Sequence, residues 1–147
     1  MPATTTVRAS ATIQAPATVV FGFVSEYKHA LQVIEGLEDM SPLGHQTSGV
    51  GARFHTVLSL GPKTVSAEIE IVELVEPRIV TWASSGRDSR SITFQLEEAG
   101  ESTTVRLTIA YERAETLSAI LLAPVVEEAV RSRAHRTLDR LRELSER

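Results

Sequence analysis

The chain has 147 residues, enough for one globular domain whose hydrophobic core needs neither disulfides nor a metal. Its net charge of −4 argues against nucleic acid as a partner, because proteins that bind phosphate backbones usually carry an excess of positive charge. The absence of cysteine excludes disulfides, thiolate metal sites and cysteine nucleophiles, and fits a reducing compartment.

The sequence shows neither a secretion signal nor a membrane span. Residues 1–10 lack the apolar region of a signal peptide, and no stretch approaches the roughly 20 apolar residues that cross a bilayer. We therefore expect a cytoplasmic protein without a transmembrane segment.

The N-terminal part predicts one strand and two short helices. Residues 2–6 are small and polar and are expected to fray, whereas residues 7–13 alternate apolar and polar side chains as a half-buried strand does. Pro16 then suits the first turn of a helix. A second helix is expected over His29–Glu35, closed by Gly36.

Residues 37–112 predict an antiparallel meander. Period-two alternation recurs in short segments, and glycine- or proline-containing turns of a few residues separate them, which is too short for parallel crossovers. The clearest alternating apolar faces are Phe54/Thr56/Leu58/Leu60, Val65/Ala67/Ile69/Ile71, Ile92/Phe94/Leu96 and Val105/Leu107/Ile109/Tyr111.

From Ala114 to the end the period becomes helical. Thr116 is a candidate N-cap, and Pro124 should kink the helix or divide it into two arms. One apolar stripe is predicted to face the sheet: Leu117, Leu121, Val125, Val130, Ala134, Leu138, Leu141 and Leu144.

These elements give the order strand, two helices, six strands, helix. The long C-terminal helix is the element that can cover the apolar face of the sheet. The prediction is an α+β fold, a curved antiparallel sheet of about seven strands around that helix, forming a single domain over residues 1–147 with an ordered core of about 7–145.

This order resembles the START-like helix-grip superfamily, also called SRPBCC, which includes polyketide cyclases, coenzyme-Q-binding proteins and lipid-transfer domains. The resemblance spans nearly the whole chain, and four local motifs carry it in the right order. They are Ile13-Gln14-Ala15-Pro16 with Val20-Phe21, Gly49-Val50-Gly51-Ala52-Arg53-Phe54, Glu76-Pro77-Arg78 with Trp82, and Gly100 followed by Thr103-Thr104-Val105.

The resemblance implies a cavity between sheet and helix that binds a small hydrophobic molecule, with or without polyketide cyclase/dehydrase-like chemistry. Two alternatives remain open at this point: a carrier of lipid or quinone without catalysis, and a protein-interaction module. The fold does not choose among them, because one fold hosts many functions. Monomer and homodimer both remain open.

Arg90 is the charged candidate for ligand binding. It shares strand phase with Ile92 and Phe94, which would point its guanidinium toward the concave face to hold a ligand carboxylate, phenolate or enolate. The competing interpretation is a solvated side chain just beyond the sheet edge.

Five further candidates for the cavity lining are uncharged. Trp82 and Tyr111 each combine a flat ring with one polar atom, although such residues are more often plain core. Thr56 is a polar position on an apolar face, and Phe54 and Phe94 belong to the same inward faces.

The sequence identifies no catalytic residues, because no Ser-His-Asp or paired-carboxylate arrangement is apparent. Glu26 and Glu112 are candidate bases if they line the cavity, and His29 is expected near its mouth. The four histidines lack metal-ligand spacing, so neither a metal nor a cofactor is predicted. The basic run Arg131–Arg136 is predicted to be a solvated helix face.

Overall fold

The structure is a computed structural model, and it describes residues 3–60, 63–84, 89–113 and 116–147. Its elements follow the predicted order, beginning with strand β1 (Ala3–Ile13) and helices α1 (Ala17–Ser25) and α2 (Tyr27–Val33), and ending with helix α3 (Leu117–Ser145). The strands between the helices are β2 (Leu37–Pro42), β3 (Arg53–Leu60), β4 (Lys63–Val75), β5 (Ile79–Ser84), β6 (Arg90–Ala99) and β7 (Ser102–Arg113).

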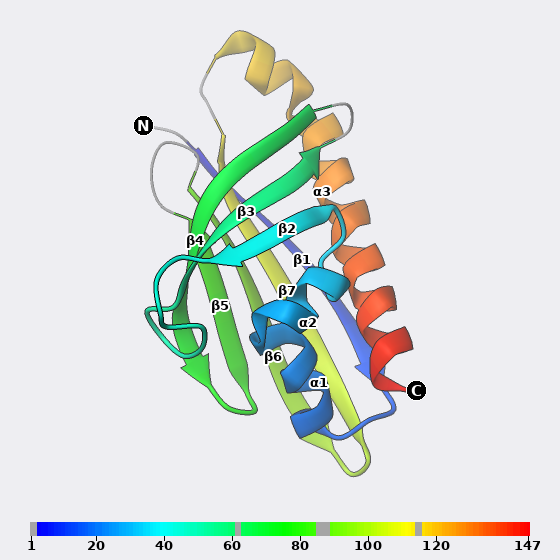
Figure 1. Ribbon diagram of the computed structural model, residues 1–147. Helices are drawn as coiled ribbons and strands as arrows, with labels where there is room; N and C mark the ends of the chain where they lie inside the picture. The colour runs from blue at the N-terminus through cyan, green and yellow to red at the C-terminus, as the bar shows by residue number, and fades with distance from the viewer. Residues whose placement is uncertain (1–2, 61–62, 85–88, 114–115) are drawn as a thin grey trace.

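The seven strands form one antiparallel sheet in the order β1-β7-β6-β5-β4-β3-β2. The sheet curves around α3, which packs on β1 and β7, while α1 and α2 lie beside the C-terminal half of α3 (Figure 1). This is the predicted α+β helix-grip fold. Because β1 and β2 are the two edges of the sheet, the concave face near β3 lies far from the strands on which α3 rests.

The core fills the space between the concave face and the helices. Trp82 is 1% exposed, and its indole Nε1 donates a 2.9 Å hydrogen bond to the carbonyl of Val24, which joins β5 to α1. The ring of Phe54 packs between those of Trp82 and Tyr27, at centroid distances of 5.6 and 5.2 Å.

Two N-terminal boundaries differ from the sequence prediction. Residues 3–6 are not frayed, since β1 begins at Ala3 and its pairing with β7 continues to Ala3–Arg113. Pro2, the first residue of the predicted frayed segment, lies outside the described residues. The second helix spans Tyr27–Val33 rather than His29–Glu35, because Glu26 before it and Ile34 after it have extended backbone.

Helix α3 begins and bends as predicted. The hydroxyl of Thr116 accepts a 3.2 Å hydrogen bond from the amide of Ala119. Figure 1 shows the first turns of α3 set at an angle to the rest, and Pro124, which lies in this part, removes a helical hydrogen bond and crowds the preceding turn.

The predicted apolar stripe of α3 is correct in its C-terminal half and wrong in its N-terminal half. Ala134, Leu138 and Leu141 are buried, whereas Leu117 and Leu121 are 74% and 70% exposed. The reason is the angle of the first turns, which takes residues 117–126 away from the strands on which the rest of α3 packs (Figure 1). We call residues 117–126 the apolar arm, since no charged side chain occurs in it.

The turn between α2 and β2 depends on Gly36. Its φ is +87°, and its carbonyl accepts a 2.7 Å hydrogen bond from the amide of Ser59 on β3. A Cβ at this position would collide with the guanidinium of Arg133 on α3 and lie 3.1 Å from the carbonyl oxygen of Ser59. Glycine is therefore favoured by the backbone conformation, and a larger residue would also displace the guanidinium of Arg133 from Ser59.

We expect Gly36→Ala to lower the free energy of unfolding by about 2 kcal/mol or more, because left-handed backbone strain adds to this collision. Gly100→Ala is the matched control: Gly100 also has positive φ, at 65°, but no atom lies within 4 Å of the added Cβ. Denaturant unfolding should show a loss of about 1 kcal/mol for the control. Equal losses in the two variants would contradict the crowding at Gly36.

Candidate functional site

A cavity with two adjoining chambers lies between the concave face of the sheet and α3. The inner chamber has a volume of about 150 Å³ and the outer one of about 380 Å³. Both are lined by Leu58, Arg90, Ile109 and Arg133, which therefore form the neck between them.

The inner chamber is lined mainly by apolar side chains. Apart from the neck, its walls come from the α2–β2 turn and the central strands: Ile34, Leu37, Thr56, Val65, Ala67, Ile69, Trp82, Ser84, Ser91 and Ile92. The hydroxyl of Thr56 already donates a 2.8 Å hydrogen bond to the carbonyl of Ala67. This wall therefore offers a ligand apolar contact rather than a free hydroxyl proton.

The outer chamber combines an apolar wall with charged residues. The wall is the inner side of α3, and the end of β7 supplies Tyr111, Glu112 and Arg113. The α3 residues are Ala119, Leu122, Ala123, Val126 and Val130, so the apolar arm forms part of the wall.

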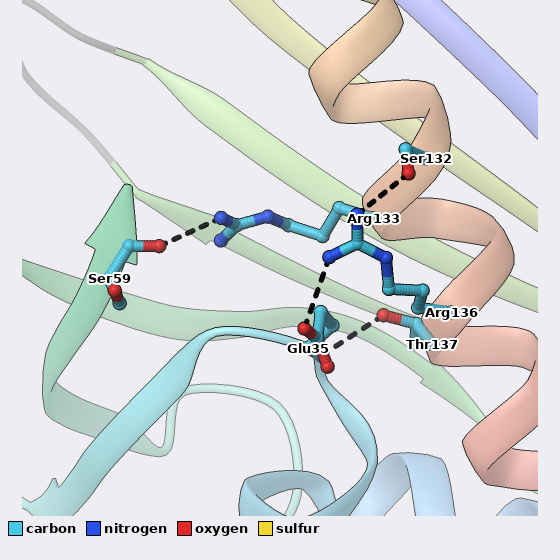
Figure 2. Close-up of polar contacts among 6 residues, drawn as sticks. All are labelled: Glu35, Ser59, Ser132, Arg133, Arg136 and Thr137. Carbon is cyan, nitrogen blue, oxygen red and sulfur yellow. Dashed lines mark hydrogen bonds and ion pairs between the residues drawn. The ribbon is translucent and has the colours of Figure 1, made fainter. Parts of the chain in front are cut away.

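Arg133 reaches from α3 across the concave face to β3. Its Nη2 donates a 2.7 Å hydrogen bond to the carbonyl of Ser59 (Figure 2). Beside it, the amide of Glu35 donates a 3.1 Å hydrogen bond to the hydroxyl of Thr137. These two bonds hold the α2–β2 turn and the end of β3 against the middle of α3.

Among the residues that the structure describes, no carboxylate forms an ion pair with Arg133. Its Nη1 is buried without a hydrogen-bond partner, and the nearby carboxylate of Glu35 pairs instead with Arg136, at 3.4 Å (Figure 2). Burial lowers the pKa of Arg133, and the charges of Arg136 and Arg90 also act to lower it, against an opposing effect of Glu35. Arginine nevertheless stays charged at neutral pH.

Positive charge predominates around the cavity. Among the described lining residues, Arg90 and Arg133 line the neck and Arg113 lines the outer chamber, against one carboxylate, that of Glu112. Within the described ranges, none of these arginines has a carboxylate oxygen within ion-pair distance, and the Nε of Arg113 is also buried without a partner. Unpaired charges next to an apolar cavity favour an anionic group there.

Tyr111 is the other titratable group with a shifted pKa. Burial, and secondly the negative charge of Glu127, raise the pKa of its phenol above the usual 10.0. The side chain therefore remains protonated at neutral pH, and it can donate a hydrogen bond into the outer chamber.

Four of the six predicted ligand-binding residues line the cavity, and two do not. Arg90, Thr56 and Trp82 line the inner chamber, and Arg90 and Tyr111 line the outer one. Phe54 and Phe94 are fully buried in the core and do not belong to the lining of either chamber. A role for any of the six in binding remains a prediction.

The position of Arg133 in the cavity was not predicted, because the basic run Arg131–Arg136 was predicted to be a solvated helix face. Arg131, Arg133 and Arg136 do not share one environment: Arg133 spans the cavity, whereas Arg136 lies on the surface. A signal was present, because Val126, Val130, Arg133 and Thr137 recur at spacings of three and four residues, which places them on one helical face.

The candidate acid–base residues are separated in space. Glu26 pairs with His29 at 3.1 Å, and neither belongs to the lining of the two chambers, whereas Glu112 lines the outer chamber. In the described part of the chain, no cluster of three or more His, Asp and Glu side chains is arranged to hold a metal ion. Among the described helices, none has the length and apolar character required to cross a membrane.

A larger hollow of about 710 Å³ lies elsewhere and is less suited to an apolar ligand. Its lining includes the exposed side chains of Gln95, Glu97, Glu98 and Arg106. We therefore place the candidate site in the two chambers under α3.

The chain matches the family model described as "Polyketide cyclase / dehydrase and lipid transport" over residues 4–146, and it belongs to this family. The resemblance to the START-like helix-grip superfamily is thereby confirmed. Among curated protein sequences, none matches the chain.

Solved structures share the fold at low sequence identity. TTHA0849 from Thermus thermophilus is 22% identical, with 95% of each chain covered and a TM-score of 0.81. The Zhui aromatase/cyclase from a Streptomyces species is 14% identical, covering 99% of this chain and 95% of that one, also with a TM-score of 0.81. Norcoclaurine synthase from Thalictrum flavum is 13% identical, covering 99% and 96%, with a TM-score of 0.73.

The raised pKa of Tyr111 can be measured directly. The difference between alkaline absorbance titrations of the wild type and Tyr111→Phe isolates the ionisation of Tyr111, and we expect its midpoint above pH 10. A tyrosine in the unfolded chain ionises near pH 10, so the stability linked to this shift is present below pH 10 and is lost as the pH rises through the folded-state pKa.

Glu127→Gln provides the control for cause. Removing its charge should lower the midpoint slightly while leaving the larger effect of burial in place. A midpoint at or below pH 10 in the wild type would contradict the raised pKa that partial burial gives the Tyr111 phenol.

Proposed function

We propose that the protein binds a small, mainly apolar molecule in the cavity under α3, with its apolar part in the inner chamber. The observation that carries this proposal is the composition of that chamber, whose walls are aliphatic and aromatic apart from a few hydroxyls and the two arginines of the neck. Burying apolar ligand surface against such walls is favourable, by roughly 25 cal/mol per Å² before the costs of association.

The family description supports this proposal, because it names lipid transport beside polyketide cyclase and dehydrase activity. The chemistry of the inner chamber favours binding over catalysis. Among the described residues of its lining, the charged side chains are Arg90 and Arg133, and no carboxylate or histidine is present to accept a proton from a substrate.

A catalytic function is the second candidate, and it would be located in the outer chamber. Glu112 and the protonated phenol of Tyr111 both line that chamber and are the candidate base and acid. The Zhui structure, an aromatase/cyclase by its name, shares the fold. Proton transfer would require both groups to reach one ligand, so we place binding first.

The test is a cavity-blocking variant with a control on the opposite face of the same strand. Ala67 lines the inner chamber, whereas the adjacent Ser66 lies on the other side of β4, because successive side chains of a strand point to opposite faces. We expect Ala67→Phe to weaken binding of the uncharged fluorescent probe N-phenylnaphthylamine by about tenfold or more, which is about 1.4 kcal/mol, and Ser66→Phe to leave it unchanged.

Trp82 gives an independent signal, since it is the single tryptophan of the chain and lines the inner chamber. Its fluorescence should change when the probe binds to the wild type or Ser66→Phe. Equal probe affinity in Ala67→Phe and Ser66→Phe, in proteins that unfold at similar temperatures, would place the binding elsewhere and overturn the proposal.

A further inference from the structure

The neck of the cavity concentrates positive charge at the point where its apolar and charged parts meet. Arg90, from the first residue of β6, and Arg133, from the middle of α3, both line the inner and the outer chamber. Because both positively charged side chains line the neck, they repel each other, although the effect of Arg90 on the pKa of Arg133 is smaller than those of burial, Glu35 and Arg136. An anion at the neck would relieve that repulsion.

The hydrogen bonds of Arg133 leave part of its guanidinium unused. Nη2 is held by the carbonyl of Ser59, while Nη1 is buried against Gly36 with no acceptor among the described residues. A buried donor on a charged group costs free energy unless an acceptor is supplied. The carboxylate of Glu35 does not meet this need, because it pairs with Arg136 on the surface side of α3 (Figure 2).

The geometry points to an apolar carboxylic acid as the ligand class: we propose that Arg133 and Arg90 hold its carboxylate at the neck while its apolar chain fills the inner chamber. This inference rests on the proposed function, since it assigns the charged end of the molecule that the cavity binds. A carboxylate suits the site because it accepts hydrogen bonds from guanidinium groups through two oxygens and carries a single charge.

Glu112 does not cancel this preference. It lines the outer chamber but is absent from the lining of the inner one, whereas both arginines line both. Arg113 adds a third positive charge to the outer chamber. A carboxylate at the neck therefore lies near Arg90 of β6, Arg133 of α3 and Arg113 of β7. Among the described lining residues, the nearby carboxylate is that of Glu112 in the outer chamber.

The test compares matched acids and alcohols as competitors of N-phenylnaphthylamine. Hexanoate, octanoate and decanoate are each paired with the alcohol of the same length, so each pair differs only in the charged end. At neutral pH and moderate salt, we expect the best-binding acid to bind wild type about ten- to a hundredfold more tightly than its alcohol, as charge-assisted hydrogen bonds allow.

Arg133→Gln should abolish this preference by weakening the acid while leaving the affinity for the alcohol within about threefold. Arg140→Gln is the matched control, because it removes the same charge seven residues along α3 from an exposed side chain that bonds the carbonyl of Gln32 rather than a carboxylate. It should keep the preference. If Arg133→Gln does not fold, Arg90→Gln takes its place and should reduce the preference by about threefold or more.

Three other outcomes would each refute a different part of the proposal. Equal affinities of acid and alcohol for the wild type would refute the carboxylate anchor and leave the proposed apolar binding intact. A preference that persists in Arg133→Gln and in Arg90→Gln would refute the assignment to these arginines. Failure of the wild type to bind the probe, the acids and the alcohols would contradict the proposed function itself.

Discussion

The contact on which the cavity depends is the hydrogen bond from Arg133 to the carbonyl of Ser59. Helix α3 rests on β1 and β7 at one side of the sheet, whereas Ser59 belongs to β3, next to the opposite edge. The side chain of Arg133 spans this distance and ends in a hydrogen bond to β3, which an aliphatic side chain could not form. Because Gly36 bonds the same residue of β3, one guanidinium positions the α2–β2 turn, the end of β3 and the middle of α3 together.

The partial burial of the Arg133 guanidinium is energetically unfavourable, and it also determines which ligands the site favours. A half-buried guanidinium beside a second arginine is unfavourable unless an anion compensates it. The side chains of the inner chamber are otherwise mostly apolar, so a molecule that satisfies both parts of the cavity has a hydrocarbon body and one negative end. In the outer chamber, Glu112 and the protonated Tyr111 are the candidate base and acid for proton transfer with a ligand held at the neck. Binding and chemistry would thus use adjoining parts of one cavity.

Much of this structure follows from local sequence patterns. Alternation along the strands, short glycine- and proline-containing turns and the helical period after Ala114 were enough to predict the order of elements and the helix-grip architecture. The inward positions of Arg90, Thr56 and Trp82 also follow from strand phase. The exposure of Leu117 and Leu121 could not be predicted, because it depends on the direction in which α3 leaves its bend.

Arg133 illustrates a different limit of sequence reasoning. It lies in a run of arginines that by composition indicates a solvated face, and its partner Ser59 is 74 residues away along the chain. Only the tertiary fold brings the two together, and only the pairing of Glu35 with Arg136 leaves Arg133 without a counterion. Helical spacing to Val126, Val130 and Thr137 predicts the face of Arg133 but not the cavity below it.

The most direct measurement of the central claim is the ionisation of a carboxyl group inside the cavity. Octanoic acid labelled with carbon-13 at its carboxyl carbon can be titrated by NMR in complex with the protein, from neutral pH down to the limit of the folded state. A carboxylate among arginines is stabilised in its charged form. We therefore expect the carboxyl pKa of bound octanoic acid to lie below that of the free acid in water. A pKa above that of the free acid would show that desolvation dominates, and it would contradict an arginine-lined neck as the anchor.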